Sequence, residues 1–334
     1  METLKTILSS KTTYWLLALI LGVAFPSFLD GYLVSLLILI YIWMILCCSM
    51  NIIYGYTGQL SLAQAAFFGV GAYAFGLFTV KLHLNFWPAF LMAVVLTGLL
   101  GFLIGIPALK LRGPYFILVT LGFSVIISEI IVAWVDLTGG ANGLAGIPRP
   151  SPIPLPSGAH LRFDSLLPMY YFTLFFLAIT MIFCRRLIGS LVGKTFLAIS
   201  CNETLAESLG INTMSRKLLS FVISAVVAGI AGVLYGSYNI VISPEIAYFA
   251  RSMDLVAFLI VGGAGTMAGP VLGTMVLMAV PELLQVIPSL KTLINGIILL
   301  LFLIFVPSGI TGGFENVKRK HYLSRIRSYG SARR

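Results

Sequence analysis

Side chains that could carry out catalysis are few and scattered in this chain of 334 residues. Its three histidines, His83, His160 and His321, lie far apart, and no HExxH, CxxC or GxSxG motif accompanies them. Residues 189–195 come closest to a phosphate-binding loop, but three residues separate their glycines instead of four, and no strand precedes them. We therefore expect no catalytic residue, no metal site and no cofactor bound by this chain.

A polar loop over residues 185–216 has a pattern that favours docking to another protein. Asn202 can cap a short helix and Gly210 can end it, while Glu203 and Glu207 place acidic groups near its start. Such a helix, lying parallel to a membrane, fits a groove on a cytosolic partner, although a plain interfacial helix would show the same pattern. The predicted docking residues are Asn202, Glu203, Ala206, Glu207, Ser208 and Gly210.

A glycine-rich segment near residue 265 is our main candidate for a solute path. An apolar stretch of only about ten residues, from Met253, precedes Gly262 and Gly263, and this is too short to cross a bilayer. Broken helices persist at membrane depth only where protein shields them or where they line a wet cavity. The alternative is a longer, tilted helix. Gly265 and Gly269 belong to a run of glycines every fourth residue, continued by Gly273, which favours close helix packing.

Glu129 lies within or near the outer end of a predicted span. An ionisable group at membrane depth is a functional candidate, so we include Glu129 among the path residues. A local structural role near the interface is an equally good interpretation.

Apolar helices must position all these residues. The chain is 59% hydrophobic and 10% charged, which leaves too little polar surface for a water-soluble globule of this size. The short alternating segments of a β-barrel are absent, so we predict an all-α, polytopic integral membrane helix bundle. About ten transmembrane helices are expected, over residues 14–29, 31–53, 60–80, 86–109, 114–135, 166–184, 217–241, 253–262, 266–284 and 293–306.

Basic residues predict the orientation of the bundle. The net charge of +10 could suggest nucleic acid, but the basic side chains lie in short loops and in a tail over residues 311–334, as orientation signals do. With ten spans, 16 of the 21 Lys and Arg residues lie inside and 5 outside, the latter including Arg251. We therefore expect a transmembrane domain over residues 1–310, in contact with lipid, and both termini in the cytoplasm. The outer segment 136–164, with five prolines, could receive a solute-binding protein or act as a spacer.

Several ordered blocks resemble the permease subunit of branched-chain amino acid ABC importers. They run from about Asn51 to Pro307 and comprise residues 58–69, 111–115, 119–123, 137–144, 206–212, 217–225, 228–232 and 262–270. The resemblance implies ten spans and a coupling helix in the loop between spans six and seven. Gln59, Ser61 and Gln64, in the first block, are further path candidates. At Ser200 and Cys201 the chain departs from the family, which usually has an Arg-Glu pair there.

The resemblance also implies partners and a location. These are a second homologous permease, two cytoplasmic ATP-binding subunits that carry the ATP, and an external solute-binding protein, in a bacterial-type plasma (inner) membrane. The chain is then a transport subunit without an ATPase site, importing branched-chain or similar small amino acids. Alternatives are a urea or short-amide permease, an ion-coupled secondary transporter, disfavoured by the scarcity of buried acidic residues, and an integral membrane enzyme.

Overall fold

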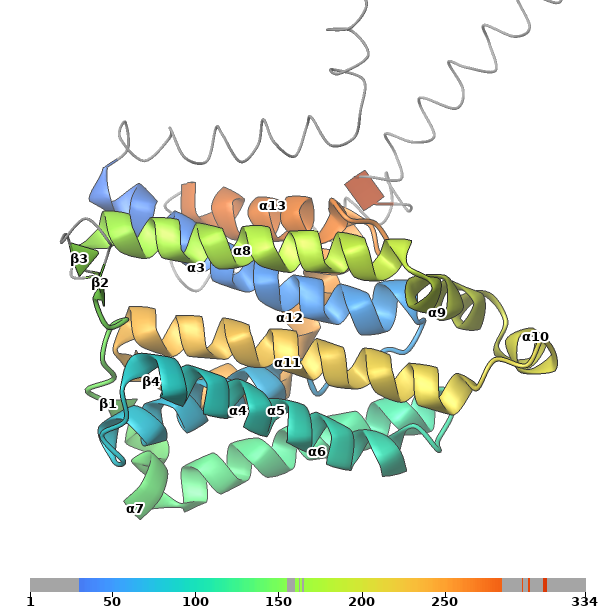
Figure 1. The fold of residues 1–334 in the computed structure, drawn as a ribbon, viewed down its shortest axis with the longest axis horizontal. Coiled ribbons are helices and arrows are strands. Elements are labelled where there is room, and N and C mark those ends of the chain that lie inside the picture. Colours follow the sequence, from blue (N-terminus) through green and yellow to red (C-terminus); the bar gives the residue numbers. More distant parts are fainter. Residues whose placement is uncertain are drawn as a thin grey trace, which may run out of the picture.

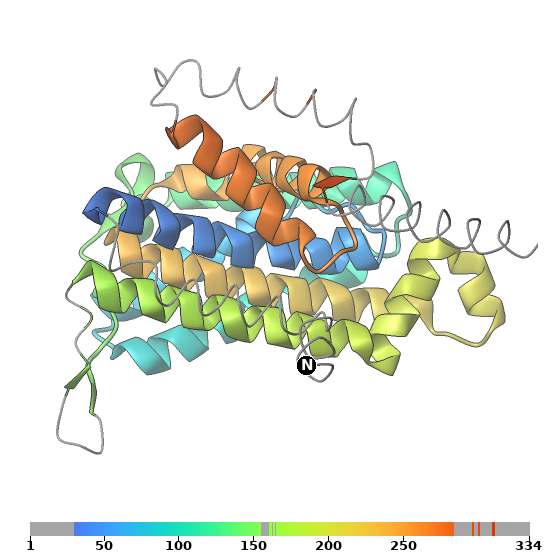
Figure 2. The same ribbon diagram turned by 90° about the horizontal axis from the view of Figure 1, so that it is seen from above.

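The protein is an elongated bundle of helices, with short strands at one end and two short helices beyond the other (Figures 1 and 2). A computed structural model describes residues 30–283 except 155–159, 162 and 164, together with residues 296, 300, 309 and 310. The helices are α3 (Gly31–Met50), η2 (Asn51–Tyr56), α4 (Gln64–Val80), α5 (Phe86–Ala108), α6 (Pro114–Ala133), α7 (Val135–Thr138), η3 (Gly140–Asn142), α8 (Leu166–Gly189), α9 (Leu191–Cys201), α10 (Glu203–Ser208), α11 (Thr213–Asn239), η4 (Pro244–Ala247), α12 (Phe249–Gly262) and α13 (Gly269–Leu283). The strands are β1 (Leu144–Ala145), β2 (Ile153–Pro154), β3 (His160–Leu161) and β4 (Val241–Ile242).

Five helices in the described part of the chain are long and apolar enough to cross a membrane. They are α3 continued by η2 over Gly31–Tyr56, and α5, α6, α8 and α11. The all-α membrane class is therefore confirmed. The predicted spans 14–29 and 293–306 and the basic tail lie outside the described residues, apart from residues 296 and 300, so the count of ten stays a prediction.

Two predicted spans are interrupted or shifted. The span expected over residues 60–80 begins as a helix only at Gln64, because residues 57–63 are not helical and Gly58 has a φ of +74°. The short span expected from Met253 begins at Phe249 and has 14 residues, about 21 Å at 1.5 Å per residue. The charge count was wrong to place Arg251 in an outer loop, because it lies within α12.

Helix α11 lies at the centre and packs against α3, α4 and α5. The α4–α11 contact depends on glycines: a Cβ on Gly71 would lie 2.5 Å from the Gly229 carbonyl oxygen, and one on Gly232 would overlap the Phe68 carbonyl oxygen. Gly101 similarly faces Ala225 of α11. Only glycine lets these backbones approach so closely, so small residues set the packing of α11.

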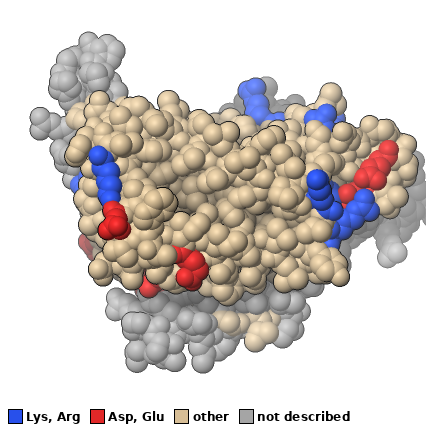
Figure 3. Space-filling model, turned by 90° about the horizontal axis from the view of Figure 1, so that it is seen from below, with Lys and Arg blue, Asp and Glu red and all other residues tan. Residues whose placement is uncertain are grey.

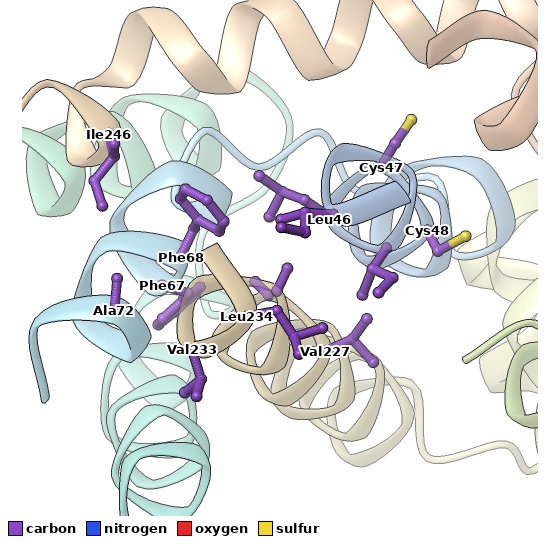
Figure 4. Close-up of a cluster of buried hydrophobic side chains, with 14 of the residues drawn as sticks. Leu46, Cys47, Cys48, Phe67, Phe68, Ala72, Val227, Val233, Leu234 and Ile246 are labelled. Carbon is purple, nitrogen blue, oxygen red and sulfur yellow. The ribbon is translucent and has the colours of Figure 1, made fainter. Parts of the chain in front are cut away.

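Large apolar side chains fill the space around this crossing. Figure 4 shows Phe67 and Phe68 of α4 beside Leu46 of α3 and Val227 and Leu234 of α11, all of them buried. The core therefore joins α3 and α4, which are close in the sequence, to the distant helix α11.

Short sheets close the end of the bundle opposite α10 (Figure 1). β1 pairs antiparallel with β4, with Leu144 opposite Ile242, and β2 pairs with β3 in the proline-rich segment. On the face in Figure 3, charged side chains gather mainly toward the two ends of the bundle, and the surface between them is largely uncharged. This distribution suits a protein whose middle lies in hydrocarbon.

Candidate functional site

The polar loop folds into two helices, α9 and α10, which project from one end of the bundle (Figures 1 and 2). The Ser190 hydroxyl accepts a hydrogen bond from the Gly193 amide at the start of α9. The predicted cap of α10 is confirmed, because Asn202 Oδ1 accepts from the Leu205 amide at 3.0 Å. Each helix thus has its own N-terminal cap.

The end of α10 is also as predicted. Gly210 has a φ of +82° and its amide bonds to the Glu207 carbonyl at 2.9 Å, while the Ile211 amide bonds to the Ala206 carbonyl at 3.1 Å. This pair of bonds is the Schellman arrangement, in which a left-handed glycine ends a helix. Asn212 then caps α11 through the Ser215 amide.

The two glutamates of α10 form contacts within the chain. Glu203 Oε1 lies 2.5 Å from Lys217 Nζ, and the Lys217 side chain is only 3% exposed. Glu207 Oε1 accepts from the Thr213 hydroxyl at 2.6 Å and lies 3.8 Å from an Arg112 nitrogen. Arg112 comes from the connection between α5 and α6. The ion pairs therefore hold α10 against the base of α11 and beside that connection.

The outward side of α10 is apolar. Leu205 is 58% exposed and Leu209 is 73% exposed, four residues apart on one helical face. The small side chain of Ala206, in the same helix, is buried. Exposed leucines on a projecting helix are a surface that another protein can cover.

Helix α9 connects the loop to the bundle. Phe196 and Ile199 are buried, and Ser200 lies against Gly58, where a Cβ would come within 3.1 Å of the Ser200 hydroxyl. Gly58 lies two residues after the end of η2. Helix α9 is therefore in direct contact with the chain that follows the α3 span.

The end of that span holds the glycine-rich segment between α12 and α13. Asn51 donates from Nδ2 to the Thr266 carbonyl at 2.8 Å and accepts from the Gly265 amide at 2.9 Å. Asn51 opens the π-helical segment η2, and such segments are frequent at functional sites. One amide side chain thus bonds to two backbone groups of the turn, the Thr266 carbonyl and the Gly265 amide.

The glycines after α12 bring two backbones together. A Cβ on Gly262 would overlap the Gly269 carbonyl oxygen, and one on Gly273 would overlap the Phe258 carbonyl oxygen. Gly263 ends α12 with a φ of +107°, and Gly265 lies in the following turn. The broken-helix hypothesis is therefore supported by a 14-residue helix, a turn, and a second helix packed against the first.

Gln64 and Ser61 are buried at the start of α4. Gln64 accepts from Ser49 at 3.0 Å and donates to Ser224 at 3.2 Å, which joins α3, α4 and α11. The Ser61 hydroxyl accepts from the Ala63 amide, within the same non-helical segment. Gln59 follows Gly58 and is half-buried.

Glu129 lies apart from the other candidates. It is exposed on α6, which covers the bundle on the α4 side, whereas Gln64 is fully buried. In the described part of the chain no group of three or more His, Cys, Asp or Glu side chains could hold a metal ion.

Sequence reasoning missed the residues that hold the site together. Asn51 is a lone amide in a long apolar run, and a buried polar group in such a run requires a partner, so its position was a usable signal. Lys217 and Arg112 were counted only as orientation charges. Their pairing with α10 requires the α5–α6 connection to reach the base of α11, which no local pattern reveals.

The chain was compared with protein families, with known proteins and with solved structures. Residues 32–306 match the family described as "Branched-chain amino acid transport system / permease component". The high-affinity branched-chain amino acid transport system permease protein LivM of Escherichia coli K12 is 30% identical over 309 residues, covering 87% of this chain and 73% of LivM. LivH of the same organism is 34% identical over 125 residues, covering 37% of this chain and 40% of LivH. A probable LivM of Methanocaldococcus jannaschii is 26% identical over 66% of this chain and 67% of its own length. No solved structure is significantly similar.

Proposed function

The chain belongs to the family of permease components of branched-chain amino acid transport systems, and from this premise we propose how it works. It forms one of two membrane-spanning subunits of an ATP-binding-cassette importer, beside a second, homologous permease. The family match over most of the chain carries this proposal, and the separate similarity to LivM and to LivH supports a pair of permeases. The relatives give no support to urea transport or to an ion-coupled transporter.

The loop of α9 and α10 is the part that meets the ATP-hydrolysing subunits. Its exposed leucines, Leu205 and Leu209, supply an apolar contact surface. The Glu203–Lys217 pair keeps α10 rigidly attached to α11, so that movement of the partner reaches the bundle instead of bending the loop. ATP is bound and hydrolysed by the partners, not by this chain.

Movement passes from α9 to the glycine-rich turn. Ser200 touches Gly58, and Asn51 at the start of η2 bonds the turn at Gly265. Shifting this turn moves α12 and α13 relative to the α4–α11 core, which opens the path to one side and then to the other. The solute arrives from an external binding protein at the end formed by β1–β4, and the α10 end faces the cytoplasm of a bacterial-type cell. Labelling of a cysteine at position 334 from outside the cell would contradict the ten-span model, in which both termini are cytoplasmic.

The test is leucine uptake by the complex of both permeases, two ATPase subunits and the binding protein in vesicles. We expect ATP-dependent uptake that is lost when Glu203→Lys opposes Lys217. The double variant Glu203→Lys/Lys217→Glu should recover most of the uptake, because it restores the pair with reversed signs. Leu205→Asp should weaken copurification of the ATPase subunits without affecting membrane insertion.

Thr204→Ala is the matched control on the same helix, since Thr204 is exposed and lies outside the predicted docking residues. Normal uptake by Glu203→Lys would refute the role of the ion pair. Absence of leucine uptake by the intact wild-type complex would refute the transport assignment itself.

A further inference from the structure

A charged pair lies halfway along the membrane-spanning part of the protein. Trp43 is the thirteenth residue of the 26-residue span Gly31–Tyr56. The guanidinium carbon of Arg251 lies 5.9 Å from the centre of the Trp43 ring, and Arg251 Nη1 lies 3.4 Å from Asp254 Oδ2. A cation and an anion are therefore held beside the midpoint of a span, where charged side chains are rare and functional.

The pair lies in the first turns of α12, which follows β4 and η4 in the chain. After β4, the chain turns into η4, whose Ala247 carbonyl accepts from Ser124 of α6 at 3.3 Å. Ser252, beside Arg251, donates to the Leu62 carbonyl at 2.8 Å and accepts from the Ala65 amide at 3.0 Å. The start of α12 is thus fixed to the buried start of α4, not to an outer loop.

The part of the chain that the structure describes leaves the pair partly open. The Arg251 side chain is 42% exposed and that of Asp254 is 48% exposed. Hydrocarbon cannot solvate two half-exposed charges, so this surface faces either water or another protein. A water-lined path between two permeases, as in the proposed function, satisfies that requirement.

Aromatic rings lie next to the charges. The Trp43 ring is 6.1 Å from Phe258 of α12 and 6.0 Å from Phe68 of α4. Phe68 in turn packs edge-on against Tyr235 of α11 at 5.3 Å. A cation, an anion and an apolar wall within one small area match the three parts of a branched-chain amino acid, which are its carboxylate, its ammonium group and its aliphatic side chain.

We propose that Arg251, Asp254 and Trp43 form a transient binding site for the zwitterion of an aliphatic α-amino acid during its passage through the membrane. Arg251 binds the carboxylate, Asp254 binds the ammonium group, and the aliphatic side chain lies against Trp43. The solute replaces the direct pair with two charge-assisted contacts. This inference rests on the proposed function and adds a site within the path.

The test uses the reconstituted complex with a saturating amount of leucine-loaded binding protein. We expect Arg251→Gln and Asp254→Asn each to lower uptake about tenfold, the loss typical of one charge-assisted contact. ATP hydrolysis stimulated by the binding protein should stay within about twofold, because docking and coupling are untouched. The exchange Arg251→Asp/Asp254→Arg should not restore uptake, since the order of the two charges relative to the aromatic wall is reversed. Lys81→Gln, which removes a cation at the end of α4, is the matched control and should transport normally.

Normal uptake by either neutral variant, or recovery in the exchange variant, would overturn the site, because the pair would then be a local ion pair. Loss of the second permease from the purified variants would make the pair a subunit contact and would also overturn the site.

A second experiment tests the site without changing a charge. It uses Ala250→Cys in a Cys-free chain, since Ala250 is exposed one turn before Asp254. A water-soluble thiol reagent should label it, and leucine transport should slow the labelling; no labelling would refute the site. Failure of the wild-type complex to import leucine would instead refute the proposed function.

Discussion

The α4–α11 crossing and the α12–α13 pair are built in the same way but differ in what holds them. In both, glycines let backbones touch, at Gly71 and Gly232 in the first and at Gly262 and Gly269 in the second. The first lies between two uninterrupted helices whose surroundings are filled by Phe67, Phe68 and other buried side chains. The second joins a 14-residue helix to its neighbour through a non-helical turn, to which the Asn51 amide and the Thr266 hydroxyl are hydrogen-bonded.

The difference assigns different roles to similar sequence patterns. Close packing inside a filled core has many contacts to lose, so it resists rearrangement. Close packing beside a non-helical turn can move as a unit when the bonds at Asn51 change. A glycine repeat therefore indicates a close approach of backbones, and its surroundings decide whether that contact is fixed or movable.

The largest effect is expected at the fixed crossing. Gly232→Leu forces α11 away from the Phe68 backbone and should lower the free energy of unfolding by about 3 kcal/mol or more, with no assembled complex recovered. Thermal unfolding and size-exclusion chromatography measure this. Gly122→Leu on α6 is the control, because a Cβ there meets no atom within 4 Å. A Gly232→Leu complex of normal stability would show that this crossing is not fixed.

An intermediate effect is expected at the movable pair. Gly269→Leu pushes the start of α13 against the Gly263 carbonyl and should reduce leucine uptake about tenfold or more. The complex should still copurify with its ATPase subunits. If it fails to assemble, the contact is as structural as the α4–α11 crossing, and if it transports normally, the contact lies away from the path.

The smallest effect is expected where the coupling loop meets the bundle. Gly58→Ala and Gly210→Ala impose similar backbone strain, because their φ angles are +74° and +82°, and each should cost about 1 kcal/mol. Only Gly58 contacts another element, at Ser200. The number of leucine molecules carried per ATP hydrolysed should therefore fall further in Gly58→Ala. Equal ratios would show that movement does not pass through this contact.

Apolar run length was enough to locate α3, α5, α6, α8 and α11, and capping chemistry was enough to place α10 between Asn202 and Gly210. Both signals are local. The sequence did not reveal that α4 begins only at Gln64, because residues 60–63 are as apolar as a helix would be. Their backbone groups are satisfied by distant side chains, such as Thr120 to the Leu62 amide at 3.1 Å, and this long-range bonding permits the non-helical segment.

The candidate site was predictable in its parts but not in its connections. The capped helix α10, the glycine-rich turn and Gln64 were each named as candidates from sequence, and their functional roles stay predictions. Their links through Lys217, Ser200 and Asn51 were not, because each joins elements at large sequence separation. Glu129 is a different case. The sequence shows its charge within an apolar run, but it does not show that Glu129 lies on an exposed face of α6.

The pairing of β1 with β4 also sets an order for biosynthesis. Leu144 must wait for Ile242, about 100 residues later, before its strand has a partner, and Gly71 must wait longer, about 160 residues, for Gly229. At roughly 5–20 residues per second, a ribosome needs about 5–20 s to supply the first segment and about 8–30 s to supply the second. During this interval α4 lies in the membrane with its glycine face uncovered. The newly made N-terminal half therefore remains dependent on the insertion machinery, or on other membrane proteins that shield it, until α11 has been inserted.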